Sequence, residues 1–118
     1  YQEALTMRKA LLGERHPDVA TSLNNLAALY QSQGRYEAAE PLYQEALTMR
    51  KALLGERHPD VATSLNNLAV LYANQGQYQQ AKSLLLQALE LRIQLLGPEH
   101  PHTRSTQQSL EILRSWMA

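Results

Sequence analysis

The sequence predicts an all-α protein, a solenoid of antiparallel helix pairs, from an internal repeat and two recurring apolar stripes. The segment Tyr1 to Ala27 returns letter for letter at Tyr43 to Ala69, and a weaker third copy starts at Leu85, so the period is 42 residues. A period of this size is typical of one supersecondary unit that stacks on its own copies. Each period holds two stripes of helical spacing; we call the helix after each His-Pro the first-type helix and its successor the second-type helix.

Residues 1 to 15 are expected to form the C-terminal part of a second-type helix and its loop, with Tyr1 to Leu12 in the helix. The chain opens inside a repeat and without Met, which suggests a segment of a longer protein. The truncated helix presents a face that would meet an earlier repeat. We therefore expect end-to-end self-association through it, or fraying.

Residues 16–55 are expected to form the first helix pair. Pro17 suits a first helical position and Asp18 places a carboxylate at the positive end of the helix dipole, while Gly34 ends the helix. A second stripe runs from Tyr36 to Leu54, and the short connection forces the two helices to be antiparallel. The first stripe has the spacing of an amphipathic helix and consists of Val19, Leu23, Leu26, Ala27 and Tyr30.

The same pattern returns in residues 56–97, the second predicted pair. Its helices are expected at Pro59 to Gln75 and at Tyr78 to Leu96, with Gly76 and Gly97 as the stops.

Residues 98–118 are expected to hold a closing helix, from about Thr103 to Trp116. Gln107, Glu111 and Arg114 stand where the earlier copies have Leu, Ala and Tyr, so we expect no second-type helix to pack on that face. Trp116 is expected to pack the end of the array, and anchoring a partner is the alternative. The apolar side facing the preceding pair is expected to be Leu110, Ile112, Leu113, Trp116 and Met117.

The composition argues against several classes of partner. Eleven basic and eleven acidic residues give a formal net charge of zero, so neither nucleic acid nor a membrane surface is an expected partner. The sequence contains no cysteine, no apolar run of membrane-spanning length and no signal-peptide pattern. It therefore fits a reducing compartment, and we expect the cytoplasm.

No constellation in the sequence predicts an enzyme, a cofactor or a metal site. There is no nucleophile–base pair, glycine-rich phosphate loop or cluster of carboxylates. His100 and His102 lack a third ligand at convincing spacing, so we interpret them as exposed loop residues. The tripeptide His-Pro-Asp, at His16 and His58, recurs with the repeat at a helix start, which favours a role in helix initiation.

Within each period the large and small residues resemble the tetratricopeptide repeat (TPR), which places small residues where two helices approach closely. The residues of the first copy are Leu23, Leu26, Ala27, Tyr30, Ala39, Tyr43 and Ala46, and those of the second are Leu65, Leu68, Ala69, Tyr72, Ala81, Leu85 and Ala88. The period exceeds the usual ~34 residues, and the segment TMRKALLGERHPDVATSLNNLA resembles the longer form of kinesin light chains. The resemblance implies a right-handed superhelix.

The resemblance also implies a function, a non-catalytic scaffold whose concave groove is lined by first-type helices and binds a peptide or partner segment. Amides there could pair with a peptide backbone, or could only solvate a helix face. A structural spacer or self-associating module is one alternative; a regulatory array attached to an enzyme or signalling domain outside this segment is another. The groove residues would be Thr21, Asn24, Asn25, Ala28, Gln31, Ser32, Thr63, Asn66, Asn67, Val70, Ala73 and Asn74.

Overall fold

The computed structural model describes residues 17–117, and these residues form five α-helices and no strand. The predicted all-α class is therefore confirmed for this part of the chain. The chain divides into two compact units, Tyr1–Glu56 and Arg57–Ala118. The helix expected within residues 1 to 15, and the self-association expected through it, lie outside the described residues.

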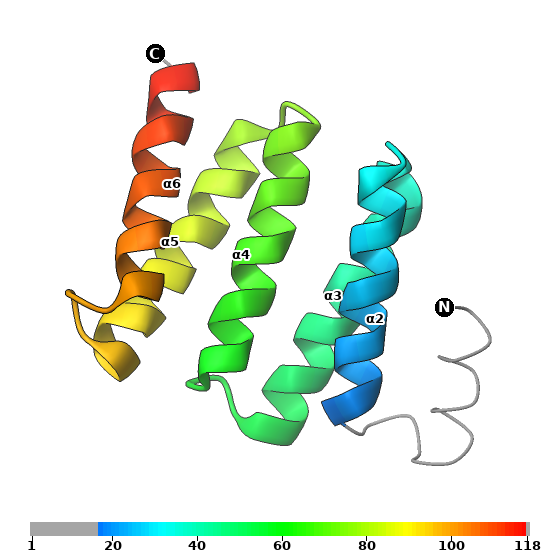
Figure 1. Cartoon of the computed structure of the whole chain (residues 1–118), viewed down its shortest axis with the longest axis horizontal. Helices are drawn as coiled ribbons and strands as arrows, with labels where there is room; N and C mark the ends of the chain where they lie inside the picture. Colours follow the sequence, from blue (N-terminus) through cyan, green and yellow to red (C-terminus); the bar gives the residue numbers. More distant parts are fainter. Residues whose placement is uncertain (1–16, 118) are drawn as a thin grey trace. The chain divides into compact units, whose positions relative to one another are not determined.

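The first unit contains a helical hairpin made of α2 (Pro17–Ser32) and α3 (Tyr36–Leu54), which lie side by side and antiparallel (Figure 1). Gly34 has a φ of 75°, a conformation that glycine adopts without steric cost. The chain then reverses, and the N–H of Arg35 donates to the carbonyl of Tyr30 at 2.8 Å. Helix α3 has the predicted bounds, and α2 begins at the predicted Pro17 and ends at Ser32, shortly before Gly34.

Small and large side chains alternate in the interior of this hairpin. Ala27 and Ala39 are fully buried, and their size lets the two helices approach closely while larger side chains fill the space on either side. Each fully buried Val or Leu contributes about 1.5–3 kcal/mol relative to exposure. One core cluster of the unit consists of Val19, Ala20, Leu23, Leu26, Ala46 and Met49, with Tyr30 and Leu42 packed against it.

The second unit contains α4 (Pro59–Asn74), α5 (Tyr78–Leu96) and α6 (Pro101–Met117). Helix α5 packs against both α4 and α6 (Figure 1). The bounds of α5 are as predicted, and α4 ends one residue before the predicted Gln75, which caps it. A core cluster of this unit consists of Ala69, Ala81, Leu85, Leu110 and Leu113.

Histidine side chains cap the starts of α4 and α6. His58 Nδ1 accepts the backbone N–H of Asp60 at 3.0 Å, and His100 Nδ1 accepts that of His102 at 3.1 Å. Each of these bonds satisfies one of the N–H groups that the first turn of a helix leaves open. Helix α6 thus begins at Pro101, and the prediction that it begins near Thr103 was wrong because the cap lies at His100.

The two faces of α6 differ sharply. Thr103, Thr106, Leu110 and Leu113 are buried, at the spacing of one helical stripe. A flanking face is exposed and consists of Gln107, Glu111 and Arg114. The prediction for Ile112 and Trp116 holds only in part, because more than half of each side chain is exposed, although the Trp116 ring lies beside Tyr78 of α5.

A buried guanidinium ties the three helices of the second unit together. Arg92 on α5 donates to Thr106 Oγ1 at 2.7 Å and to the His102 carbonyl at 3.3 Å, both on α6, and to Thr63 Oγ1 on α4 at 3.4 Å. Burial lowers the pKa of the Arg92 guanidinium by removing it from water. The bonds of Arg92 hold α4 and α6 at a fixed separation on α5.

Candidate interaction groove

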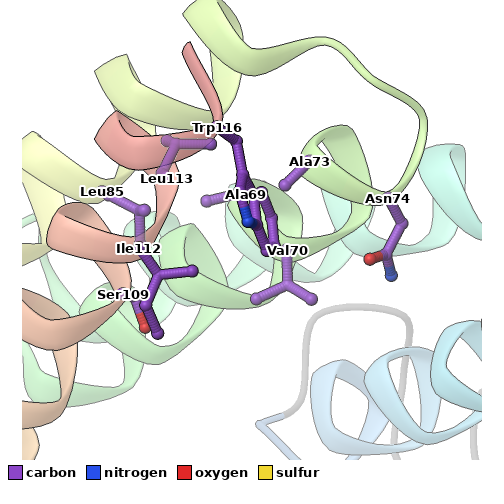
Figure 2. A pocket seen from close by; sticks show the side chains of 9 residues that line it. All are labelled: Ala69, Val70, Ala73, Asn74, Leu85, Ser109, Ile112, Leu113 and Trp116. Atoms are coloured by element: carbon purple, nitrogen blue, oxygen red, sulfur yellow. The ribbon is translucent and has the colours of Figure 1, made fainter. Parts of the chain in front are cut away.

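A hollow of about 180 Å³ lies between α4 and α6, and α5 contributes to it (Figure 2). It forms because α4 and α6, the two first-type helices of this unit, both pack on α5. A channel is left between the faces that these two helices turn toward each other. Its lining residues come from all three helices: Ala69, Val70, Ala73 and Asn74 of α4, Leu85 of α5, and Ser109, Ile112, Leu113 and Trp116 of α6.

The floor of this groove is part of the core. Ala69, Leu85 and Leu113 are buried and belong to the core cluster of the second unit. Ala69 and Ala73 carry only a methyl group, so they leave open the space that a larger side chain would fill. The floor is therefore held by packing that the fold itself requires.

The walls are apolar and open to solvent. Val70 is 41% exposed, Ile112 52% and Trp116 57%. Isolated exposed apolar side chains are ordinary on protein surfaces, but three that line one hollow form a contiguous patch. Their gathering makes the hollow a candidate site for binding a protein segment or a ligand.

The indole of Trp116 is supported from the side. Its ring centroid lies 6.1 Å from that of Tyr78, at the start of α5, with an angle of 51° between the ring planes. Tilted aromatic pairs at this separation are favourable beyond the area that they bury. Tyr78 thus contacts one side of Trp116 at the groove.

The lining carries no charge. Asn74 and Ser109 are the polar residues among the nine, and Figure 2 shows Asn74 at one side, apart from the other side chains. An amide offers a donor and an acceptor, and a hydroxyl offers both from one atom. The groove can therefore supply apolar contact and a few hydrogen bonds to a bound segment.

The six predicted groove residues of α4 divide into two sets. Val70, Ala73 and Asn74 line the groove, whereas Asn66 and Asn67 are half-buried outside its lining. Thr63 takes part in helix packing, since its hydroxyl donates to the Pro59 carbonyl at 3.3 Å and accepts from Arg92.

Asn24 of α2 is not the exposed amide that the sequence suggested. It is only 8% exposed. With the amide turned so that its oxygen faces α3, Oδ1 accepts from Arg50 Nη1 at 2.7 Å and from Nη2 at 3.1 Å. The expectation of an available groove amide is corrected here, because the side chain is engaged inside the hairpin.

The other predicted groove residues of α2 are more exposed than Asn24. Asn25 and Ala28 are exposed. Gln31 Oε1 accepts from the Tyr43 hydroxyl at 2.8 Å, and Ser32 donates to the Leu29 carbonyl at 2.7 Å. The hydroxyl of Thr21, another exposed residue, accepts from Arg50 at 3.5 Å.

Ile112 and Trp116 were missed as groove residues by the sequence analysis. The signal was present in the period, because adding 42 to Val70 and Asn74 gives these two positions of α6. The apolar character of the two side chains pointed instead to core packing. For Trp116 the expectation of packing holds only in part, since the indole lies beside Tyr78 while more than half of the side chain is exposed.

The two histidines that the sequence analysis considered as metal ligands, His100 and His102, lie at the start of α6. His100 caps α6, and its ring centroid lies 5.0 Å from that of His102. Among residues 17–117, no group of three or more His, Cys, Asp or Glu side chains is placed to hold a metal ion. In the same residues, no helix combines the length and apolar character that crossing a membrane requires.

Comparison with known proteins shows the family. The sequence model of the tetratricopeptide repeat matches residues 1–52, 24–94 and 60–115, and no curated protein sequence matches the chain. A crystal structure of a Podosopora anserina protein, assigned as a kinesin light chain with nearly identical TPR-like repeats, is 28% identical with a TM-score of 0.86. The match covers 95% of this chain and 53% of that one.

A second solved structure has the same kind of repeat. BtubC (BKLC) from P. vanneervenii is 27% identical, with a TM-score of 0.79 over 99% of this chain and 55% of its own. The chain thus spans about half the length of these similar structures. With repeats that match along nearly its whole length, this chain belongs to the tetratricopeptide repeat family.

Proposed function

We propose that this chain is a non-catalytic protein-interaction module, and that it binds a peptide or partner segment in the groove between α4 and α6. The observation that carries the proposal is the gathering of Val70, Ile112 and Trp116 around one hollow. Repeats of this family generally mediate protein–protein interaction, which agrees with an apolar groove of this kind.

Two features of the groove suit a peptide-like ligand. Its walls stand on two helices held in place by a third, so little reorganisation is needed on binding. Its apolar centre is accompanied by Asn74 and Ser109, which can pair with the polar backbone of a bound segment. Asn66 and Asn67, further along α4, would extend the contact, and on α2 the counterparts of Asn67 and Val70, which are Asn25 and Ala28, are exposed. As part of this proposal we place the module in the cytoplasm, in agreement with a sequence that lacks cysteine.

The test is affinity capture with three versions of the chain, followed by identification of the bound proteins. Ile112→Ser and Trp116→Ala alter the groove walls, whereas Leu86→Ser changes a side chain that is 41% exposed on α5 outside the groove. Partners that the two groove variants lose and the Leu86 variant retains would support the proposal. Equal capture by all three would place the interaction surface elsewhere.

The same preparations test the alternative of a self-associating spacer. Light scattering of the purified chain over a range of concentrations would reveal association without any ligand. The spacer would be favoured by two results together. The chain would still associate in all three variants (Leu86→Ser, Ile112→Ser and Trp116→Ala), and no captured partner would depend on the groove.

A further inference from the structure

We propose that the exposed face of α5 binds a second copy of this chain, and that the two copies pair through antiparallel α5 helices whose two-fold axis passes near Leu86. This face is separate from the groove between α4 and α6, because the nine residues that line the groove include none of its exposed side chains. The inference therefore does not rest on the proposed function.

Helix α5 carries two stripes on opposite sides. The buried stripe packs within the second unit and consists of Ala81, Leu85, Ala88 and Arg92. The other stripe is exposed, and its residues follow one another at alternating steps of four and three. This is the repeat with which two paired helices keep one seam in contact. We call these residues the α5 seam: Gln79, Ser83, Leu86, Glu90 and Ile93.

Two large apolar side chains stand in the seam. Leu86 is 41% exposed and Ile93 is 39% exposed. The packing of the repeat does not require them, because α3 has Gln44 and Lys51 at the equivalent positions. The first copy of the period has the same Gln and Lys. The third copy thus exposes apolar area where two earlier copies are polar, and this area is available for burial against a partner.

Two charged side chains indicate which partner fits the seam. Lys82, beside the seam, lies four residues before Leu86, and Glu90 lies four residues after it. If a second α5 crosses antiparallel at Leu86, Lys82 of each copy lies level with Glu90 of the other, so both ends of the contact pair opposite charges. A parallel crossing would place lysine beside lysine and glutamate beside glutamate. The charges therefore match a second α5 and select the antiparallel direction.

The surface between these two charges can receive a side chain. A shallow hollow of about 400 Å³ lies there, with Lys82, Ser83, Leu86 and Glu90 in its lining. The small side chain of Ser83 leaves the space open, and its hydroxyl is a second donor for the Glu90 carboxylate of the other copy. Within one chain, Glu90 Oε1 accepts from Gln94 Nε2 at 3.4 Å. A carboxylate has about four acceptor sites, so it can also accept from the second copy.

The dimer is expected to be weak. The formal net charge of the chain is zero, so two copies approach each other without overall repulsion. However, a contact made by one helix of each copy is small beside stable interfaces, which bury about 1,200–2,000 Å² in total. We therefore expect a dimer that forms at high protein concentration and weakens when salt screens the two charge pairs.

The first experiment follows the association of the 118-residue chain by sedimentation at concentrations up to about 1 mM, the range in which a contact of this size is measurable. Methyl resonances of Leu86 and Ile93 report the seam, and those of Leu53, which is 38% exposed on α3, report a surface outside it. We expect a monomer–dimer equilibrium in which only the seam methyls shift with concentration. A chain that remains monomeric, or that associates without shifting the seam methyls, would overturn the inference.

The repeat itself supplies the variants of the apolar residues. Leu86→Gln and Ile93→Lys introduce the residues that α3 has at these positions, so the helix should still form, as circular dichroism would verify. The double variant should raise the dissociation constant of the dimer at least ~10-fold. Leu53→Gln changes a side chain of similar exposure on α3 and should leave the dissociation constant unchanged. Association that the double variant retains would overturn the inference.

Charge reversal tests the direction of the pairing. Lys82→Glu and Glu90→Lys should each weaken the dimer several-fold, because each places like charges together at both ends of an antiparallel contact. The chain with both reversals should regain the parent affinity, since every opposite pair is restored. Single reversals that leave the dimer unchanged, or a double reversal that binds no better than the single ones, would overturn the antiparallel pairing.

Discussion

Arg50 on α3 and Asn24 on α2 form a buried pair inside the first hairpin, with both Nη atoms of the guanidinium donating to one amide oxygen at 2.7 and 3.1 Å. The planar guanidinium presents its donors as a fixed fork, so one acceptor can receive two of them. Arg50 also donates to Thr21 at 3.5 Å. The pair fastens the middle of α2 to α3, and this position gives Asn24 a structural role.

We predict that Asn24→Ala lowers the free energy of unfolding by about 1–3 kcal/mol, because the buried guanidinium of Arg50 loses the amide oxygen that accepts from both of its Nη atoms. Asn25→Ala, next to it on the exposed side of α2, should stay within about 0.5 kcal/mol of the parent. Urea unfolding followed by circular dichroism measures both. Similar effects of the two substitutions would show that the pair with Arg50 contributes no net stability.

A second prediction concerns two buried threonines of α6. Thr103 Oγ1 is buried with no hydrogen-bond partner, whereas Thr106 Oγ1 donates to the His102 carbonyl at 3.0 Å and accepts from Arg92. The earlier copies have Val61 and Val19 at the position of Thr103. Thr103→Val should therefore raise the free energy of unfolding by about 1 kcal/mol, because an unsatisfied hydroxyl is removed without loss of volume.

Thr106→Val provides the matched control on the same face of the helix. It should lower the free energy of unfolding by about 1–3 kcal/mol, since Arg92 loses its shortest hydrogen bond. If these two identical substitutions, three residues apart, change the free energy of unfolding in opposite directions, helix propensity and side-chain volume would hardly explain the difference. If Thr103→Val also destabilises, the hydroxyl of Thr103 is satisfied in solution.

A third prediction concerns the cap of α6. His100→Ala removes the acceptor of the His102 N–H, so we expect a loss of about 0.5–2 kcal/mol in the stability of this helix. His100→Asp keeps an acceptor there and adds a negative charge to a first turn that has no acidic residue; the helix dipole should make this variant at least as stable as the parent. The hydrogen-exchange rate of the His102 amide measures directly whether the hydrogen bond of the cap is present. Unchanged protection in His100→Ala would contradict the role assigned to the imidazole.

The helices were predictable because each local signal agreed with the repeat. Proline at the first helical position predicts the start of α2, and the apolar stripes with the glycine stops predict the bounds of α3 and α5. The start of α6 was misplaced because histidine is not among the common capping residues. Its Nδ1 nonetheless serves as the acceptor at His58 and His100, the two His-Pro turns whose histidine the structure describes.

The groove was predictable only in part, because periodicity identifies a face of a helix but not what covers it. Asn24 and Asn25 are neighbours on α2, yet Asn24 is buried because its side chain pairs with Arg50 of α3. Ile112 and Trp116 look like core residues by composition, and they are exposed because Thr103, Thr106, Leu110 and Leu113 already occupy the contact with the rest of the unit. Tertiary packing decided both cases.

A final prediction concerns the stability of the first hairpin in alkali. The Tyr43 hydroxyl donates to Gln31 Oε1 at 2.8 Å, and burial raises the pKa of Tyr43 above its ordinary value. At pH values well below about 10 the phenol keeps its proton in both the folded and the unfolded chain, so its contribution to stability is fully present. As the pH rises further, the unfolded chain loses the proton first. The folded state then binds more protons than the unfolded state, and the free energy of unfolding falls until the pH reaches the raised pKa of the folded protein.

Urea unfolding at intervals between pH 8 and pH 11 measures this loss, with Tyr43→Phe as the comparison. At pH 8 the Phe variant should be less stable by about 0.5–1.5 kcal/mol, because it lacks the hydrogen bond to Gln31. Above pH 10 the gap should narrow, since only the parent loses stability through this phenol. Tyr43→Leu, which introduces the residue that the second copy has at Leu85, should show the same narrowing although its packing differs. A gap that stays constant from pH 8 to pH 11 would show that the Tyr43 phenol ionises equally well in the folded and unfolded chains.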